Sequence, residues 1–222
     1  QPGWAELDPD GVIDKCLAVI RETAEALPPD AIRGLGVSSQ GEAFTALDAD
    51  GNCLCNAMIS SDLRAAEIAR SWPADFGAER LYQITGHTAH PMFTLFKLLW
   101  LRDHAPDVWQ RAERFLCFED LLGFRLGLDP AMGWPLAGRT MLFDVRRHEW
   151  NPQILDAAGV SPDRLARPLP SGTVAGTIPR EMAASLGLGD DVPVVTGGHD
   201  QPCGALGAGA TQAGVAMYAT GT

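Results

Sequence analysis

The stretch of chain over 192–209 constrains the fold more strongly than any other part of the sequence. It opens with a β-branched run, Val192 to Thr196, which is typical of a buried strand. Gly197 and Gly198 come next, and because glycine accepts positive φ angles we expect the backbone to turn sharply there. The turn would hold Asp200 at the C-terminal end of the strand, where open α/β sheets usually place their ligands. Its carboxylate either meets a substrate or caps the following helix, and this segment alone leaves both interpretations open.

Size, charge and cysteine content limit the class of protein. A chain of 222 residues with 46% hydrophobic residues is large enough to fold around one main core. The formal net charge of −11 and the pI near 4.8 oppose binding to nucleic acid or to an anionic membrane, so we expect neither as a partner. The five cysteines, in a chain too large to need disulfides, favour free thiols and a cytoplasmic location. The sequence has neither an apolar run of about 18 residues nor an N-terminal signal, which agrees with that location.

Both ends of the sequence are interpreted as cut. The chain starts at Gln1, and the following Pro2-Gly3 is typical of the middle of a loop. At the other end, a strand-like run over 215–219 is followed only by a few residues, so it has nothing to pair with. We therefore interpret the chain as a piece of a larger protein.

Hydrophobic periodicity predicts alternating helices and strands. A helix over 8–24 follows from the capping signal Asp8-Pro9 and from apolar residues at helical spacing. Short β-rich runs at 32–37, 43–47 and 54–59 predict three strands, and the turn at 48–51 makes the last two a hairpin. We further predict helices over 62–72, 93–101, 109–126 (one or two), 154–158 and 204–210, strands over 192–196 and 215–219, a loop over 127–138, a crossing segment over 141–145 and a proline-rich stretch over 168–179. This order indicates an α/β domain with helices packed on a mixed sheet.

A second group of polar residues follows the first of these strands. Gln40 and Glu42 flank Gly41 and put an amide and a carboxylate beside a glycine. Each sugar hydroxyl both donates and accepts a hydrogen bond, so a sugar pocket needs such side chains, and an unpaired buried polar group costs about 1–3 kcal/mol. A surface hairpin corner is the competing interpretation. Asp62 is similarly open to two interpretations, as a helix cap or as a binding residue.

Three other motifs are weaker. His87 and His90 have the spacing of metal ligands on a helix, but no third ligand stands near and a loop is expected there. Cys53 and Cys55 would share one face of a strand without a further Cys or His to complete a metal site. The glycines over 204–209 are not in the order of a dinucleotide-binding turn, and no acidic residue follows about 20 positions on. We predict no metal site and no Rossmann site.

Several segments, in order along the chain, resemble the N-terminal domain of FGGY carbohydrate kinases. The motif Gly-His-Asp-Gln over 198–201, read without a gap to Gly221-Thr222, resembles the end of that domain. The segment 38–42 resembles the strand whose form is Gln-Arg-Glu in glycerol kinases and Gln-Met-His in xylulokinases. Further similar segments are 56–64, which resembles the family's Trp-Asn-Asp-x-Arg, then Thr85-Gly86 with 91–100, and 137–140 with Asp144 and Trp150, which we interpret as architectural.

The resemblance implies a ribonuclease-H-like domain of the actin and hexokinase ATPase type, an α/β fold with a mixed sheet flanked by helices. Residues 1–222 would be the N-terminal, sugar-binding domain without its first strands and first phosphate loop. The C-terminal ATP-binding domain would lie outside this chain, as its partner in the same polypeptide. The reaction implied is transfer of the γ-phosphoryl group of ATP, used with Mg²⁺, to a hydroxyl of a sugar or polyol. This chain alone would then be inactive, and a homodimer is left open.

The resemblance also assigns roles to single residues. Asp200 matches the catalytic base, and Gly221 and Thr222 match the start of a phosphate-binding hairpin. The residues expected to bind the substrate are Gln40, Glu42, Asp62, Met92 and Gln201.

Two departures from the family pattern bear on the substrate. Gly41 stands where glycerol kinases have arginine, and Ser60 stands where the family has tryptophan. We therefore expect a roomier pocket, suited to a ketopentose or a four-to-six-carbon polyol rather than to glycerol. The alternative is a catalytically inactive sugar-binding or regulatory module derived from such a kinase.

Overall fold

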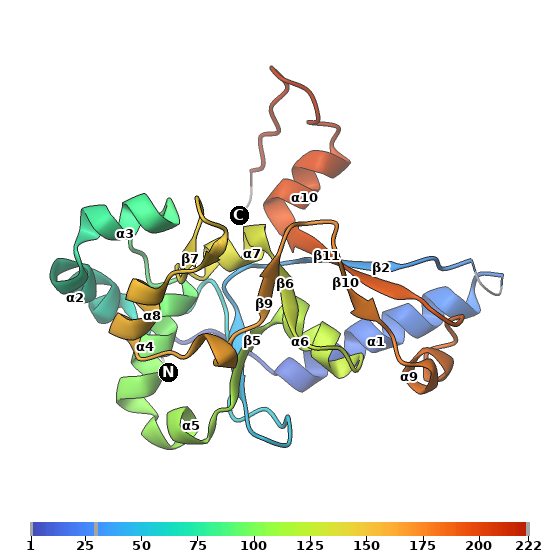
Figure 1. Cartoon of the computed structure of the whole chain (residues 1–222), viewed down its shortest axis with the longest axis horizontal. Coiled ribbons are helices and arrows are strands. Elements are labelled where there is room, and N and C mark those ends of the chain that lie inside the picture. The colour runs from blue at the N-terminus through green and yellow to red at the C-terminus, as the bar shows by residue number, and fades with distance from the viewer. Residues whose placement is uncertain (1, 29–30, 221–222) are drawn as a thin grey trace.

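The computed structural model describes residues 2–28 and 31–220, which form a mixed α/β fold (Figure 1). One sheet has the order β1-β4-β3-β5 and is antiparallel throughout, and the other has the order β10-β11-β2, with β2 parallel and β10 antiparallel to β11. The first sheet consists of β1 (Glu6–Leu7), β3 (Phe44–Leu47), β4 (Ala57–Met58) and β5 (Arg114–Cys117), and the second of β2 (Leu35–Ser39), β10 (Val174–Thr177) and β11 (Pro193–His199). Two smaller pairs are β6 (Ala131–Gly133) with β9 (Arg167–Leu169) and β7 (Phe143–Asp144) with β8 (Glu149–Trp150). The mixed sheet flanked by helices is the predicted fold class.

The helices fall into two groups around these sheets. At the right of Figure 1, α1 (Pro9–Glu25) packs on α6 (Phe118–Arg125), and α6 contacts β2 and β11 of the second sheet. At the left of Figure 1 lie α2 (Ala66–Phe76), α3 (Ala78–Thr85), α4 (Thr94–His104), α5 (Pro106–Arg111) and α8 (Pro152–Ala158). The remaining helical segments are α7 (Trp134–Arg139), the 3₁₀ turn η1 (Pro162–Arg164), α9 (Arg180–Ser185) and α10 (Asp200–Gly207).

The helix α4 is central to the core. Its residues Thr94 to Leu99 are all buried, including the charged Lys97, so this helix is covered on nearly every side. Such a helix loses the usual polar stripe of a surface helix, and its apolar side chains join the hydrophobic core. The buried lysine is therefore an exception that needs a partner.

The end of β11 differs from the predicted sharp turn. β11 continues through Gly197 and Gly198 to His199, and the pairing with β2 shifts register between Val195 and Gly198. A Cβ atom at Gly197 would lie 1.8 Å from the carbonyl oxygen of Val37, so glycine is needed there for the close approach of two strands. The prediction of a turn at these glycines was wrong, because the glycines serve strand packing instead.

The start of α10 also corrects the prediction. The helix begins at Asp200, four residues earlier than expected, and its N-cap is His199, whose side chain accepts from the backbone N–H of Gln201. Asp200 is therefore not the cap of this helix. The interpretation of its carboxylate as a cap was wrong.

Several shorter elements differ from the sequence-based prediction. The stretch 109–126 contains the strand β5 between α5 and α6, the expected loop over 127–138 holds β6 and α7, and the proline-rich stretch holds β9 and β10. The helix expected from Asp62 begins at Ala66. The strand expected over 215–219 is absent from the described tail up to 220, where Tyr218 is 88% exposed and has no strand to pair with.

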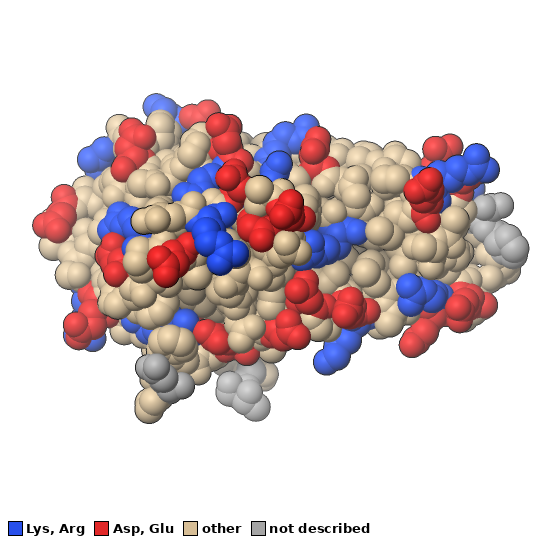
Figure 2. Space-filling view, turned by 90° about the horizontal axis from the view of Figure 1, so that it is seen from below, with Lys and Arg blue, Asp and Glu red and all other residues tan. Residues whose placement is uncertain are grey.

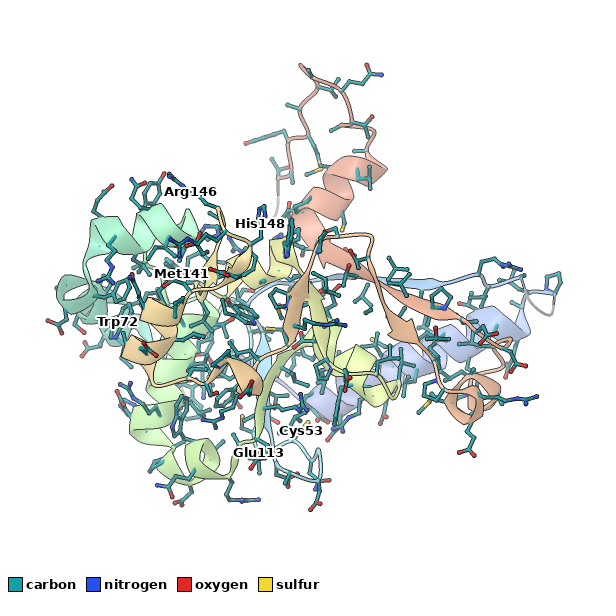
Figure 3. All side chains as sticks on the ribbon, viewed as in Figure 1. Cys53, Trp72, Glu113, Met141, Arg146 and His148 are labelled. Atoms are coloured by element: carbon teal, nitrogen blue, oxygen red, sulfur yellow. The ribbon has the colours of Figure 1, made fainter. Side chains whose placement is uncertain are left out.

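Acidic and basic side chains are interspersed over the face drawn in Figure 2. The turn between β7 and β8 carries His148 (Figure 3). The ring of His148 stacks on that of Trp134 in α7, with centroids 3.9 Å apart. All five cysteines are free, as predicted, and within the described ranges no helix has the length and apolar character needed to cross a membrane.

Candidate active site

The parallel pairing of β2 with β11 brings two of the predicted site residues to one edge. His199 pairs with Ser39, so Asp200 and Gln40 each follow directly after a paired residue at the C-terminal ends of adjacent strands. The side chain of Asp200 is 50% exposed, and its Oδ1 lies 3.3 Å from Nε2 of His199. Gln40 is half-buried, whereas Gln201 is exposed on the first turn of α10. A carboxylate and an amide therefore lie at the same edge of the sheet, where ligands bind in open α/β sheets.

Glu42 is a buried acidic group three residues after the end of β2. The residue is 1% exposed, and its carboxylate forms an ion pair with Arg139 of α7 through Oε1. Its Oε2 accepts a hydrogen bond of 2.8 Å from the hydroxyl of Ser60. A buried carboxylate needs such compensation, because an unpaired charge in the interior is strongly disfavoured. The Glu42 side chain is only 2% exposed and both oxygens have partners, so its contact with a ligand hydroxyl stays a prediction.

Gly41 lies under the side chain of that arginine. A Cβ atom at Gly41 would lie 2.6 Å from Cβ of Arg139 and 2.9 Å from Cδ2 of His199. The space next to Gly41 is thus filled by an arginine that enters from α7. The expectation of a roomier pocket at this position was wrong, because a packed interior does not leave the volume of a missing side chain empty.

Met92 joins the same cluster. Its sulfur lies 3.7 Å from Nη2 of Arg139, and the guanidinium of Arg139 stands 4.8 Å from the ring centroid of Phe93. Arg139 therefore connects Glu42, Met92 and Phe93, although its motif was interpreted as architectural. The sequence offered one indirect signal: a glutamate at a buried strand end with glycine beside it requires a cation from elsewhere in the chain.

His87 lies close to these groups. Its ring is 4.9 Å from that of Phe93, and its pKa lies below the ordinary value because of burial and the nearby positive charge of Arg139, against the opposite effect of Glu42. The neutral imidazole that results at pH 7 can donate one hydrogen bond and accept another, as a sugar hydroxyl requires. The residue lies between α3 and α4 rather than on a helix, and among the described residues no group of three metal-ligating side chains is found.

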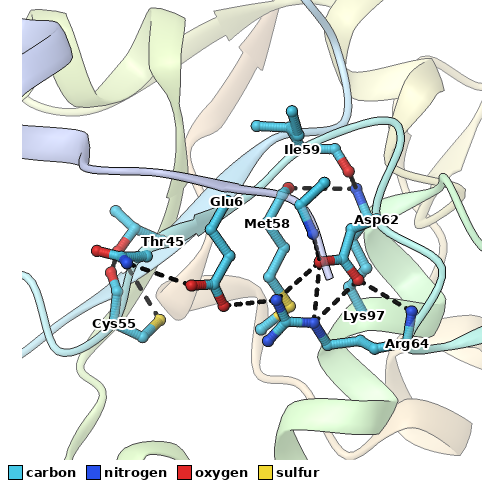
Figure 4. A network of polar contacts seen from close by, with 10 residues as sticks. Glu6, Thr45, Cys55, Met58, Ile59, Asp62, Arg64 and Lys97 are labelled. Atoms are coloured by element: carbon cyan, nitrogen blue, oxygen red, sulfur yellow. Dashed lines mark hydrogen bonds and ion pairs between the residues drawn. The ribbon is translucent and has the colours of Figure 1, made fainter. Parts of the chain in front are cut away.

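Asp62 belongs to a network of polar contacts with Arg64 and the N-terminal segment (Figure 4). It is fully buried, and its two oxygens accept from the guanidinium and backbone N–H of Arg64 and from the backbone N–H of Ala5. Burial raises the pKa of this carboxyl, but these hydrogen bonds and the charge of Arg64 outweigh it and hold the pKa below its ordinary value. With both oxygens occupied, Asp62 supports the local fold, and its contact with the substrate stays a prediction. The prediction that Asp62 caps α2 was wrong, because the N-cap of that helix is Ala65.

Arg64 continues this support to the N-terminal segment. Its guanidinium carbon lies 3.8 Å from the ring centroid of Trp4 and 5.0 Å from that of Trp100, and Nη2 also pairs with Glu6. The network therefore fastens β1 to the start of α2 and to α4. The predicted phosphate-binding residues Gly221 and Thr222 lie outside the described residues.

Comparison with known proteins places the chain in a family. Residues 1–207 match the FGGY family of carbohydrate kinases, N-terminal domain, and the chain belongs to this family. It is 30% identical to an L-fuculokinase of Escherichia coli over 209 residues (94% of this chain, 44% of that protein). It is 33% identical to an L-xylulose/3-keto-L-gulonate kinase of Escherichia coli over 213 residues (94% and 43%).

Solved structures agree with this assignment. The crystal structure of xylulose kinase from Rhodospirillum rubrum is similar with a TM-score of 0.86 at 26% identity, covering 96% of this chain and 44% of that one. The fold is therefore that of sugar kinases of the actin and hexokinase type, as the sequence predicted. The chain spans less than half the length of the curated relatives named above.

Proposed function

We propose that this chain is the sugar-binding part of a carbohydrate kinase that transfers the γ-phosphoryl group of ATP to a hydroxyl of a sugar or polyol. The observation that carries the proposal is the parallel pairing of His199 with Ser39, which places Asp200 and Gln40 at the same edge of one sheet. Membership in the FGGY family supports the reaction class. The cluster around Glu42 supplies the polar surface that would orient the acceptor.

Asp200 acts as the general base in this proposal. Its exposed carboxylate takes the proton of the acceptor hydroxyl while that oxygen forms a bond to the γ-phosphorus, and the bond from this phosphorus to the β–γ bridging oxygen breaks to release ADP. Because Oδ1 lies next to His199, Oδ2 is the oxygen left for the proton. A general base in this position contributes about 10²–10⁴ to the rate.

The sugar is held by groups that can pair with hydroxyls in both directions. Glu42 accepts, Arg139 donates, and Gln40 and neutral His87 do both. Met92 and Gln201 would complete the contacts on either side, and Gly221 and Thr222 would begin a loop that holds phosphate. MgATP would be bound mainly by a second domain of the same polypeptide, so residues 1–222 alone would not turn over.

The substrate proposed is a ketopentose or a polyol of four to six carbons. The names of three similar proteins, L-fuculokinase, L-xylulose/3-keto-L-gulonate kinase and xylulose kinase, support a sugar acceptor. A glycerol kinase of Thermococcus kodakarensis is also similar, at 29% identity over 230 residues, so the preference over glycerol is part of the proposal. The alternative, an inactive sugar-binding or regulatory module, keeps the same sugar contacts but does not need a base at 200.

Asp200→Asn in the complete protein separates these two proposals. Asparagine keeps the shape of aspartate but cannot take the proton, so kcat should fall by about 10² or more while the sugar Kd changes by less than about twofold. Both values are measured on the same preparation, by a coupled ADP assay with a panel of sugars and polyols and by calorimetry. Undiminished turnover in the variant would remove Asp200 from the chemistry, and a wild-type protein that binds but phosphorylates no sugar would favour the inactive module.

A further inference from the structure

Lys97 is a buried charge with an unusual set of partners. It lies on α4, is 0% exposed, and within the described part of the chain forms no ion pair with a carboxylate. Its Nζ donates instead to three backbone carbonyls: to Ile59 at 2.8 Å, and to Glu42 and Met58 at 3.2 Å each. Three acceptors match the three donors of an ammonium group, which is how the buried charge is compensated.

The three carbonyls lie where two strands stop pairing. β3 and β4 are paired at Phe44 and Met58, and the next pair on the same face of this antiparallel ladder would be Glu42 with Ser60. The strands have ended there, yet the side chains of Glu42 and Ser60 still meet, 2.8 Å apart. Lys97 joins the backbones of the two diverging segments at this point, as Figure 4 shows for its bonds to Met58 and Ile59.

A second side chain of α4 also holds the backbone of Glu42. The hydroxyl of Thr94 also donates to the carbonyl of Glu42, at 3.2 Å. The carbonyl of Glu42 is thus held by two donors one turn apart on a helix that is itself buried. The position of the Glu42 carboxylate therefore depends on α4. Thr94 and Lys97 bind the backbone carbonyl of Glu42, whereas the carboxylate itself is bound by Ser60 and Arg139.

We propose that Lys97 is a positioning residue of the sugar site: its ammonium ties the segment of Glu42 to the segment of Ser60 and so fixes the Glu42 carboxylate for the acceptor sugar. This inference rests on the proposed function in one respect, that Glu42 contacts the sugar. Lys97 itself does not reach the substrate. Its effect is on the orientation of Glu42, and loss of the ammonium should weaken sugar binding without changing nucleotide binding.

The charge state of Lys97 gives the proposal a pH dependence. Burial lowers the pKa of Lys97 to about 8, against the opposing effect of the Glu42, Cys117 and Asp62 side chains and with a smaller lowering by Arg64. These are the titratable groups that face it from the segments packed around α4. At pH 7 the ammonium satisfies all three carbonyls, and above its pKa the neutral amine has only two donors for them. Sugar binding should therefore weaken above about pH 8.

The test is Lys97→Met in the complete protein, because methionine keeps an unbranched buried stem and removes the donors. The sugar KM should rise by at least about tenfold, equivalent to about 1.4 kcal/mol, while the KM for MgATP stays within about twofold. The matched control is Leu98→Met, a buried change on the same helix that leaves the three hydrogen bonds in place and should leave the sugar KM unchanged. In wild type, kcat/KM for sugar should fall above about pH 8, and this fall should be missing in Lys97→Met.

Each outcome bears on a defined claim. A sugar KM in Lys97→Met within about twofold of wild type overturns the positioning role while leaving the kinase assignment intact. A wild-type protein that phosphorylates no sugar overturns the proposed function and this inference with it. If Lys97→Met fails to fold, two other measurements test the positioning role of Lys97. One is the pH profile of the wild type. The other is the sugar KM of Ser60→Ala, a variant that breaks the bond from Ser60 to Glu42 without touching α4. A flat profile together with an unchanged sugar KM in Ser60→Ala refutes the proposal.

Discussion

Replacing Gly41 by alanine tests the packing on which the candidate site depends. The new Cβ atom would lie 2.6 Å from Cβ and 2.7 Å from Cγ of Arg139, and 2.9 Å from Cδ2 of His199. The first two contacts are with the stem of the arginine, next to the backbone of α7, so a change of rotamer at the end of the side chain cannot relieve them. We expect α7 to be pushed away from the start of β3, carrying the Arg139 guanidinium away from Glu42.

The magnitude follows from the cost of overpacking. Inserting one methyl group into a closely packed site typically costs about 1–3 kcal/mol of unfolding free energy. If the strain is relieved mainly by separating Arg139 from Glu42, sugar affinity falls as well, by about tenfold for each 1.4 kcal/mol transmitted to the site. Stability and sugar affinity should therefore fall together in this variant.

The assay compares Gly41→Ala with Gly36→Ala in the complete protein. Gly36 lies on β2, and a Cβ atom there would meet nothing closer than the Val195 carbonyl oxygen at 4.0 Å, so it controls for the loss of a glycine in the same region. Urea midpoints give the stability and calorimetry gives the sugar Kd. Alanine at Gly36 should be neutral or stabilising by about 0.4–1 kcal/mol. If both variants match each other in stability and in sugar Kd, Gly41 is not close-packed and the argument fails.

Two further predictions concern stability. Gly197→Ala should lower the urea midpoint more than Gly41→Ala, because its Cβ atom would lie 1.8 Å from the Val37 carbonyl oxygen, between β11 and β2. A midpoint equal to that of wild type would contradict the observed pairing of β11 with β2. Asp62 has a pKa held below its ordinary value, so its stabilisation is fully present above about pH 4 and is lost as the pH falls through the folded-state pKa. Asp62→Asn should be less stable than wild type at pH 7, and it should lose less stability on acidification than wild type or the exposed control Asp75→Asn. Parallel curves of stability against pH for all three proteins would contradict a stabilising role of the Asp62 carboxylate.

The parts of the fold that could be predicted are those encoded by local patterns. The hairpin of β3 and β4, the helices α1 and α4, and the strands β2 and β11 follow from periodicity and turn residues within a few positions. The placement of Gln40 and Asp200 at one sheet edge could also be predicted once both were assigned to the C-terminal ends of strands in one sheet. β5 could not, because its four residues lie between α5 and α6 in a run whose apolar spacing suits a helix.

The partners of Glu42 could not be predicted from local sequence patterns, because they come from three separate parts of the chain. Arg139 is 97 positions away on α7, Ser60 is 18 positions away, and Lys97 reaches the backbone of Glu42 across 55 positions. Hydrophobic periodicity does not predict contacts between residues that are so far apart in the sequence. What the sequence does contain is the requirement itself, since a glutamate next to a buried strand needs a cation and donors from elsewhere in the chain.

Gly41 illustrates how that requirement constrains specificity. The absence of an arginine at this position suggested an empty space beside the sugar, yet in the folded chain a guanidinium does lie against Glu42, supplied by α7 over the bare backbone of Gly41. Any larger residue at 41 would exclude the stem of Arg139, so the glycine and the arginine form one unit. In the proposed sugar site, the shape at this point depends on the Arg139 guanidinium, which contacts both Glu42 and the sulfur of Met92, rather than on a missing side chain. Changes of specificity should accordingly require paired substitutions at 41 and 139, because either change alone leaves Glu42 without a properly placed cation.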